Sequence, residues 1–341
     1  MEEKILSASR AKLLEDCSWK YWCKYILRLP EPKNDGAVRG TACHLIFEVL
    51  LNPRHKPHYD AIVKQSTIEA SPAICRLVRK ALKREGEQFL TDENYEMCDA
   101  MILVGLNQDF FGEDSGGVVE SGEVEFLLES EDPKYKVLGF IDKPIVYKDG
   151  KEIKVVDYKT SKSKFKGQEI TANLQAMTYT LASKKLWPKS KKVIAEFLFL
   201  KFPKQPVQEI EISKDQIAGF EYYLADLYKI INNFTEEDAK ANYAAHQPYP
   251  PDKVFGGPLS CGFAKQPGQL KKDGSVMWHC SFKFPFDYHV LLDENGKQLK
   301  ISKEKSELGK PKSGQKIELR HYGGCPAHCQ VSQKQDDPFD F

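Results

Sequence analysis

Two apolar, strand-like segments each end in an aspartate, and the second aspartate is followed two residues later by a lysine. The first segment ends at Asp142, and the second runs from Val155 through Asp157 to Lys159. Alternate residues of a strand point to the same face, so Asp157 and Lys159 are expected to project together. A pair of carboxylates beside an ammonium group is what metal-assisted hydrolysis of a phosphodiester needs.

Hard divalent cations prefer oxygen ligands, and Mg²⁺ usually takes one or two carboxylates together with waters and substrate phosphate. Asp142 and Asp157 supply carboxylates, and the backbone carbonyl of Tyr158 is a further oxygen donor. Glu123 or Glu125, in the preceding strand, adds an acidic group, and the sequence does not choose between them. A surface ion pair between Asp157 and Lys159 at a strand end is the alternative interpretation of the same residues.

The elements that must position these residues follow from hydrophobic periodicity. The chain is expected to be mostly helical from residue 7 to 112 and then to form three strands, at 119–128, 136–147 and 152–159. A helix is expected at 168–186. Two more strands, at 192–202 and 206–212, and a helix capped by Ser213 should follow. Asp149-Gly150 is a hairpin signal between the second and third strands. From about Pro248 onward, Pro, Gly, Cys and Lys dominate, with short strand-like runs at 284–292 and 315–321.

We therefore expect three parts: a helical N-terminal part over residues 1–115 that carries Cys17 and His44, a core over residues 116–247, and a Cys- and Lys-rich tail over residues 248–341. Such a tail is too long to be a structureless loop of a compact domain. This tail is expected to be irregular apart from those runs and to pack back on the core.

Four elements occur in a characteristic order: a helix with Gly40-x-x-x-His44, a strand ending at Asp142, a strand with Asp157-Tyr158-Lys159, and a helix with Gln175-x-x-x-Tyr179. Their order and spacing resemble the RecB-type branch of the PD-(D/E)XK nuclease superfamily. The resemblance covers roughly residues 5 to 235. Each piece alone has an ordinary structural interpretation, and the combination is what makes the pattern specific.

The resemblance implies an α/β, restriction-endonuclease-like core with a mixed central β-sheet flanked by helices. It implies that His44 completes or adjoins a Mg²⁺ or Mn²⁺ site and that Lys159 orients or deprotonates the attacking water. Gln175 and Tyr179, at i and i+4, share a helix face that would lie over the site. The implied function is a deoxyribonuclease, in particular an exonuclease of DNA recombination, repair or replication. The sequence has no Gly-x-x-x-x-Gly-Lys-Ser/Thr motif, so any unwinding must come from a partner, such as a helicase or a recombination or replication protein.

Nine cysteines are many for a protein of a reducing compartment, where a disulfide framework is not expected. The iron–sulfur subset of this branch includes the AddB subunit and the CRISPR adaptation exonucleases, and it carries one N-terminal cysteine and three beyond the core. Resemblance to that subset implies a [4Fe–4S] cluster held by Cys17 and three tail cysteines. The tail offers four candidates, Cys261, Cys280, Cys325 and Cys329, and it lacks the tight spacing of the subset.

Two alternatives to the cluster stay open. Zinc could be held by Cys325, Cys329 and either His321 or His328, because Cys and His at short spacing suit Zn²⁺. Thiols without any metal are the other possibility. The corresponding alternatives for the whole protein are a non-catalytic DNA-binding or scaffold protein with a nuclease fold, and a zinc-organised interaction module.

Composition limits the general class of protein. The net charge is +1, so a nucleic-acid surface must come from local clustering, such as the lysines of residues 154–166. Hydrophobic residues make up 41% and charged residues 29% of the chain, as in an ordinary soluble globular protein. The N-terminus has no apolar leader segment and no run is long enough to span a membrane, so we expect a cytoplasmic protein without a membrane partner.

Overall fold

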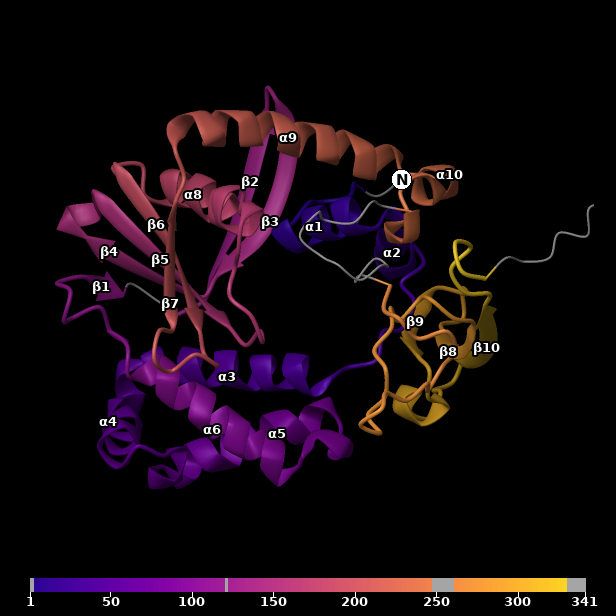
Figure 1. The fold of residues 1–341 in the computed structure, drawn as a ribbon, viewed down its shortest axis with the longest axis horizontal. Coiled ribbons are helices and arrows are strands. Elements are labelled where there is room, and N and C mark those ends of the chain that lie inside the picture. Colours follow the sequence, from indigo (N-terminus) through magenta and orange to yellow (C-terminus); the bar gives the residue numbers. More distant parts are fainter. Residues whose placement is uncertain (1–2, 120–121, 247–260, 330–341) are drawn as a thin grey trace, which may run out of the picture. The chain divides into compact units, whose positions relative to one another are not determined.

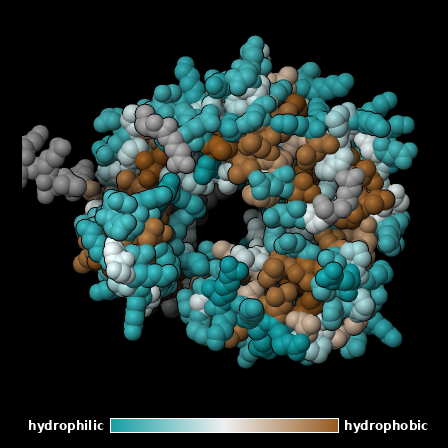
Figure 2. Space-filling model, turned by 180° about the vertical axis from the view of Figure 1, so that it is seen from behind, coloured by the Kyte–Doolittle hydropathy of each residue, from teal (hydrophilic) through white to brown (hydrophobic). Residues whose placement is uncertain are grey.

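The computed structural model describes residues 3–119, 122–246 and 261–329. The chain forms two compact units, one of residues 1–9 and 33–232 and the other of residues 10–32 and 233–341. Figure 1 shows the elements of each unit, and Figure 2 shows that hydrophilic side chains cover most of the visible surface of both. No helix among the described residues is long and apolar enough to cross a membrane.

The first unit is built on a five-stranded sheet in the order β1-β4-β5-β6-β7. Its strands are β1 (Val118–Val119), β4 (Lys143–Tyr147), β5 (Glu152–Lys159), β6 (Lys192–Phe199) and β7 (Val207–Glu211). β5 and β6 pair in parallel, and the other neighbours pair antiparallel, so the sheet is mixed. The β4–β5 hairpin turns at Asp149 and Gly150, which both have positive φ, as the Asp-Gly signal predicts.

A separate two-stranded ribbon lies between β1 and β4 in the chain. It consists of β2 (Val124–Glu131) and β3 (Lys134–Ile141), paired antiparallel. The sequence predicted one strand over residues 136–147, but the structure breaks it at Asp142 into β3 and β4, which belong to different sheets. Asp142 therefore lies at the junction of the ribbon and the central sheet.

Helices cover both faces of the central sheet in the first unit (Figure 1). One layer contains α3 (Asp35–Leu51), α4 (Lys56–Gln65), α5 (Pro72–Glu85) and α6 (Asp92–Leu106), with single turns η2 (Pro53–His55), η3 (Ile68–Ala70) and η4 (Glu87–Phe89). The other side carries α7 (Gln168–Thr171), α8 (Leu174–Leu186) and α9 (Lys214–Asn233), and η5 (Lys148–Gly150) lies in the β4–β5 turn. This arrangement confirms the predicted α/β fold with a mixed sheet between helices.

The side chains of β5 alternate between the two faces of the sheet, so this strand contacts both helical layers. Val156 and Tyr158 belong to the core cluster formed with α3 and α6, where the Tyr158 ring stacks on Phe47 at 4.1 Å between centroids. Asp157 and Lys159 point to the opposite face, toward α8, because successive strand side chains alternate. One strand therefore supplies a packed core on one face and two charged side chains on the other.

The second unit joins the early helical segment to the tail. It contains most of α1 (Ala8–Asp16), α2 (Ser18–Tyr21), the π-turn η1 (Trp22–Ile26), α10 (Glu236–Ala241), η6 (Ala244–His246) and η7 (Lys305–Leu308). A three-stranded antiparallel sheet, β10-β8-β9, is formed by β8 (Phe286–Leu292), β9 (Gln298–Ser302) and β10 (Lys316–Tyr322). The tail was expected to be largely irregular, and β8 and β10 match its two strand-like runs.

Buried hydrogen bonds hold the early segment against the tail within this unit. Trp19 Nε1 donates to the Tyr322 hydroxyl at 2.8 Å, and that hydroxyl donates to the Phe282 carbonyl at 3.0 Å. Ser18 Oγ bonds to the carbonyls of Ala239 and Asn242, both at 2.9 Å. Because a buried polar group is costly unless it is paired, these bonds specify how the two segments meet.

Candidate active site

Asp142 is fixed by two contacts at the break between β3 and β4. Its Oδ2 accepts a hydrogen bond from the Tyr158 amide at 3.1 Å. Its Oδ1 lies 3.3 Å from Nδ1 of His44, which projects from α3. The hydrogen bond from the Tyr158 amide explains why the strand breaks at Asp142. The carboxylate of Asp142 binds the neighbouring strand β5, and the backbone does not continue the β3 pairing.

Asp157 is a buried carboxylate, only 3% exposed. Its Oδ1 accepts hydrogen bonds from the Tyr179 hydroxyl and from Gln175 Nε2, each at 2.6 Å. Its Oδ2 lies 2.7 Å from Lys159 Nζ, yet it accepts no well-oriented hydrogen bond and is a buried oxygen without such a partner. Burial raises the pKa of Asp157, the charge of Lys159 lowers it, and the charge of Asp142 raises it further; the net direction is upward.

Gln175 connects the ammonium group to the carboxylate. Its Oε1 accepts from Lys159 Nζ at 2.7 Å, while its Nε2 donates to Asp157 and to the Tyr179 hydroxyl. Asn173 is the N-cap of α8, the helix that carries Gln175 and Tyr179. Its side chain accepts a hydrogen bond from the Ala176 amide at 2.9 Å. The spacing i, i+4 thus places both polar side chains of α8 on one face, above the charged end of β5.

The His44 ring bridges two oxygen atoms of the predicted metal site. Nε2 lies 3.0 Å from the Tyr158 carbonyl oxygen, and Nδ1 faces Asp142. Burial lowers the pKa of His44, but its hydrogen bond with Asp142 and the charges of Asp142 and Asp157 outweigh burial and raise the pKa above its usual value. Both partners are acceptors, so the imidazolium form satisfies them together.

Two glutamates, Glu123 and Glu48, lie in the acidic surroundings of Asp142. Burial and the charges of Asp142 and Glu48 raise the pKa of Glu123, whereas the charge of His44 lowers it. Glu125, the other candidate, is an exposed residue of β2 opposite Phe140. Sequence reasoning missed Glu48; its spacing of four residues from His44 on one helix is the signal that could have found it.

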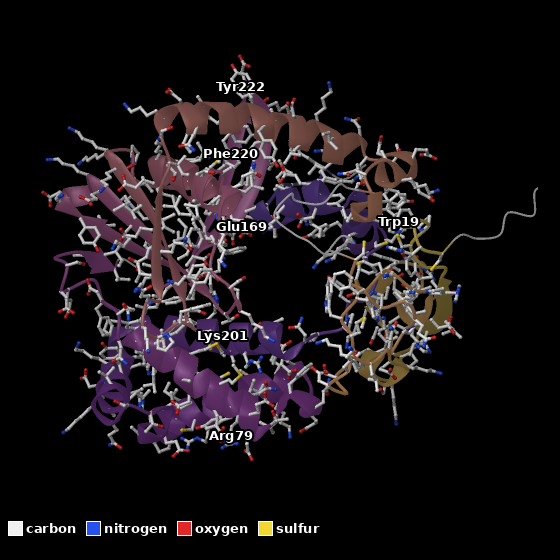
Figure 3. All side chains as sticks on the ribbon, viewed as in Figure 1. Trp19, Arg79, Glu169, Lys201, Phe220 and Tyr222 are labelled. Carbon is white, nitrogen blue, oxygen red and sulfur yellow. The ribbon has the colours of Figure 1, made fainter. Side chains whose placement is uncertain are left out.

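Arg39 on α3 forms a group of cations with Lys162, beyond β5, and Lys201, beyond β6. The charges of Arg39 and Lys162 add to burial in lowering the pKa of Lys201, which is labelled beside α3 in Figure 3. Arg39 is 7% exposed, donates from Nη1 to Asn94 at 2.6 Å, and has an Nε without a hydrogen-bond partner among the described residues. α3 and the end of β5 approach each other closely, because an added Cβ at Gly40, next to Arg39, would lie 3.1 Å from Oγ1 of Thr160, next to Lys159.

The predicted run of DNA-contacting lysines is not uniform. Lys154 is engaged in ion pairs with Glu196 at 2.9 Å and Glu209 at 3.0 Å, so its charge is neutralised within the sheet. Lys164 lies over the rings of Phe199 and Phe202. Lys162 is the member of this run whose charge reaches Lys201.

The second unit brings four predicted cysteine ligands to one pocket. Its lining comprises Cys17, Trp19, Lys20, Ala244, Cys261, Cys280, Phe282, Lys283, Cys325 and His328. Burial, with the charges of neighbouring thiols, raises the pKa of Cys261 to about 11 and that of Cys325 to about 12. Thiols that affect one another in this way lie close together around a common space.

The remaining cysteines have other surroundings. Cys329 does not line the pocket; its Sγ donates to the Lys283 carbonyl at 3.3 Å. Cys23 is fully buried and donates to the Tyr322 hydroxyl. Of the histidines proposed for zinc, His321 is exposed and contacts Asp287 at 2.7 Å. As the side chains stand, no three His, Cys, Asp or Glu groups of residues 3–119, 122–246 and 261–329 converge closely enough to bind a single metal ion.

Comparisons with known proteins place most of the chain in a family. The model of the PD-(D/E)XK nuclease superfamily matches residues 5–262. No curated protein matches the chain. Among solved structures, a candidate exonuclease from Eubacterium rectale has 11% sequence identity and a TM-score of 0.43, with 73% of this chain and 91% of that chain covered. The family model spans well over half of the sequence, and the chain belongs to the PD-(D/E)XK nuclease superfamily.

Proposed function

We propose that this protein is a divalent-metal-dependent deoxyribonuclease of the RecB type, acting as an exonuclease on DNA ends or single strands. The observation that carries the proposal is the environment of Asp157. A buried carboxylate has one oxygen held by Tyr179 and Gln175, while the other faces Lys159 without a well-oriented hydrogen bond. A second carboxylate, Asp142, raises the pKa of this buried group further, so the site concentrates negative charge that a divalent cation would offset.

The donor set fits a hard divalent cation. Asp142, Asp157 and the Tyr158 carbonyl would hold Mg²⁺ or Mn²⁺, with His44 in contact with two of these three groups. The bound ion would supply positive charge to the phosphate and lower the pKa of a water molecule. Occupation of this position requires the His44 ring to give up at least one of its contacts, since the Tyr158 carbonyl and Asp142 now face the ring.

Lys159 is the chain's own cation at the reaction centre. Its ammonium group is fixed by Gln175 and Asp157 on a rigid strand, and part of the side chain remains exposed to solvent. From there it can orient the attacking water and offset negative charge that develops on the phosphoryl oxygens. Gln175 and Tyr179 hold Asp157 and Lys159 in place, so we assign them positioning roles.

The cation group of Arg39, Lys162 and Lys201 supports a polyanionic substrate. Burial and mutual repulsion with Arg39 and Lys162 lower the pKa of Lys201, and none of the three forms an ion pair with a carboxylate among the described residues; a phosphate of the bound strand would relieve that repulsion. Gly40, the neighbour of Arg39, approaches Thr160, the neighbour of Lys159. A DNA backbone crossing the end of β5 would pass both groups.

For the second unit we propose a [4Fe–4S] cluster ligated by Cys17, Cys261, Cys280 and Cys325. Four thiols around one pocket are the ligand set of such a cluster, and they include the N-terminal cysteine and three tail cysteines. The cluster would tie residues 10–32 to the tail. Purified protein should show a broad visible absorption band and about four iron atoms per chain. A colourless protein that contains zinc and no iron would overturn this assignment.

The mode of action is tested with DNA of defined ends. Linear single-stranded and duplex oligonucleotides, labelled at either end, should be degraded to short products with Mg²⁺ or Mn²⁺, whereas circular single-stranded DNA should survive. Cleavage of circles at the same rate would contradict an exonuclease. If DNA is bound but never degraded, the protein is instead a non-catalytic DNA-binding or scaffold protein. Unwinding of long duplexes would come from a helicase or another recombination or replication partner.

A further inference from the structure

The segment between Cys261 and Cys280 forms an exposed hairpin, which we call the finger (residues 262–279). Its base is closed by the antiparallel bridge of Gly262 with His279, next to the 3.1 Å bond from the Cys280 amide to the Cys261 carbonyl. Gly262 has a φ of +70°, and a Cβ there would lie 2.2 Å from the Trp278 carbonyl oxygen, so the base requires glycine.

The outer half of the finger is a tight two-stranded ribbon. Leu270 bridges Val276, flanked by bonds from the Met277 amide to the Gln269 carbonyl at 2.7 Å and from the Lys271 amide to the Ser275 carbonyl at 2.8 Å. Gly274, with a φ of +79°, completes the turn at the tip. These backbone hydrogen bonds give the finger a defined shape. Its side chains are therefore held in fixed positions.

Large apolar side chains of the finger face solvent. Phe263, Leu270, Val276 and Trp278 are 50%, 58%, 61% and 57% exposed, respectively. Leu270 and Val276 are direct cross-strand neighbours, so their side chains lie on one face. Trp278 follows Val276 by two residues, which puts it on the same face where the chain is extended. A cluster of exposed apolar side chains marks an interaction surface more often than isolated exposed apolar side chains do.

The finger is also basic. Lys265, Lys271 and Lys272 oppose a single acidic side chain, Asp273. The Asp273 carboxylate is occupied by the Ser275 amide at 2.9 Å and the Ser275 hydroxyl at 2.6 Å. The three lysines form no ion pair with a carboxylate among the described residues. The finger therefore offers positive charge at and beside its tip and apolar, partly aromatic surface behind it.

Single-stranded nucleic acid matches both properties together. Bases stack on aromatic side chains with little regard to sequence, while lysines neutralise the phosphates between them. A duplex would offer the same phosphates but keep its base faces stacked and out of reach of Trp278 and Phe263. A cationic or neutral protein surface would leave the lysines without partners.

We infer that the finger is a contact site for single-stranded DNA, with Trp278 and Phe263 stacking on bases and Lys265, Lys271 and Lys272 binding phosphates. The identity of the ligand rests on the proposed function. The site itself is separate from the carboxylates of the first unit, and its binding is expected to need no divalent metal.

The test measures binding without cleavage. Full-length protein in EDTA is titrated into a fluorescently labelled oligothymidylate, and anisotropy gives the affinity; gel analysis afterwards confirms an intact oligonucleotide. Trp278→Ala and Phe263→Ala should each weaken binding by about 5- to 100-fold. The double change Lys271→Gln, Lys272→Gln should reduce the steepness of the salt dependence by about one. Tyr222→Ala is the matched control, since this tyrosine is 66% exposed and points away from α9 (Figure 3).

The outcomes separate this inference from the proposed function. Unchanged binding of oligothymidylate by Trp278→Ala and Phe263→Ala, in a protein that still degrades DNA with Mn²⁺, would overturn the finger and leave the nuclease intact. An equal loss of oligothymidylate binding in Tyr222→Ala would also overturn the inference. So would a larger loss, in Trp278→Ala, of binding to anionic lipid vesicles or to blunt duplex DNA than of binding to oligothymidylate. Circular dichroism of each variant verifies folding, which should be unaffected because the substituted side chains are exposed.

Discussion

At the scale of single residues, the site depends on one amide side chain that serves two charged groups. Gln175 accepts from Lys159 and donates to Asp157, so it determines the distance between ammonium and carboxylate. The sequence pattern placed Gln175 and Tyr179 on one helix face, but it could not show that both bond to the same oxygen of Asp157. That detail depends on the distance between α8 and β5, which tertiary packing sets.

Replacing Gln175 with alanine should lower the rate of DNA hydrolysis by about 10- to 100-fold, because the residue positions the carboxylate and the ammonium group without reacting itself. The affinity for oligothymidylate in EDTA should stay unchanged. Lys184→Ala, at an exposed position of the same helix, is the control and should leave both quantities as in the wild type. An equal loss of activity in both variants would argue against a positioning role for Gln175.

Lys143 is a second residue whose environment has a measurable consequence. It is fully buried at the start of β4, where its Nζ donates to the Phe110 carbonyl at 3.2 Å. Burial lowers the pKa of Lys143 to about 8, with smaller opposing contributions from Glu196 and Asp109. The folded protein therefore binds fewer protons than the unfolded chain between pH 8 and the usual lysine pKa.

This difference has a definite sign: the free energy of unfolding should rise with pH across that window, because the unfolded chain still holds the proton that the folded protein has released. At pH 7, Lys143→Met should be more stable than the wild type, by at most about 3 kcal/mol. The difference between the two proteins should shrink as the pH approaches 10. Chemical denaturation at several pH values measures it, and a constant difference would contradict the lowered pKa of Lys143.

At the scale of elements, the junctions position the site. The hairpin at Asp149-Gly150 was predictable because its turn residues carry a local signal. The break at Asp142 was not, since residues 136–147 have continuous strand character and only the contact of Asp142 with the neighbouring β5 strand separates β3 from β4. The finger was missed for a similar reason, because its short Gly- and Lys-rich strands lack the alternation that marks a ribbon.

The start of α8 offers a test of this positioning. Asn173→Ala removes the N-cap, which should cost about 1 kcal/mol of stability and should also lower nuclease activity, because the first turns of α8 carry Gln175. Thr91→Ala removes the corresponding cap of α6, where the Thr91 hydroxyl accepts from the Asn94 amide. A similar loss of stability with normal activity is expected there. If both variants lose activity in proportion to stability, the cap of α8 has no specific role in the site.

At the scale of the whole molecule, the chain leaves the second unit and returns to it: residues 10–32 and 233–341 fold together around the cysteine-lined pocket. That Cys17 meets tail cysteines far along the chain was implied by family resemblance. Spacing could not have shown which tail cysteines take part, because the choice between Cys325 and Cys329 depends on how the last described turn packs on Lys283.

If the proposed cluster is present, substitution of Cys17 by serine should reduce the iron content from about four atoms per chain toward zero and lower the melting temperature, because the cluster would lose a ligand that joins the two segments. Cys75→Ser is the control. Its thiol donates to the Ile68 carbonyl in the first unit, and a serine hydroxyl can make the same bond. Elemental analysis with differential scanning calorimetry checks both. Retention of full iron content by Cys17→Ser would exclude Cys17 as a required ligand.

A rate measurement on a single carboxylate variant decides whether Asp142, Asp157 and Lys159 form the proposed metal-dependent nuclease centre. The release of nucleotides from end-labelled single-stranded DNA is followed in Mn²⁺ for the wild type and for Asp157→Asn, which keeps the size and burial of the side chain. We predict metal-dependent hydrolysis by the wild type and a loss of at least about 100-fold in the variant, with oligothymidylate binding in EDTA retained. Hydrolysis by Asp157→Asn at the wild-type rate, or no hydrolysis by the wild type, would contradict the account.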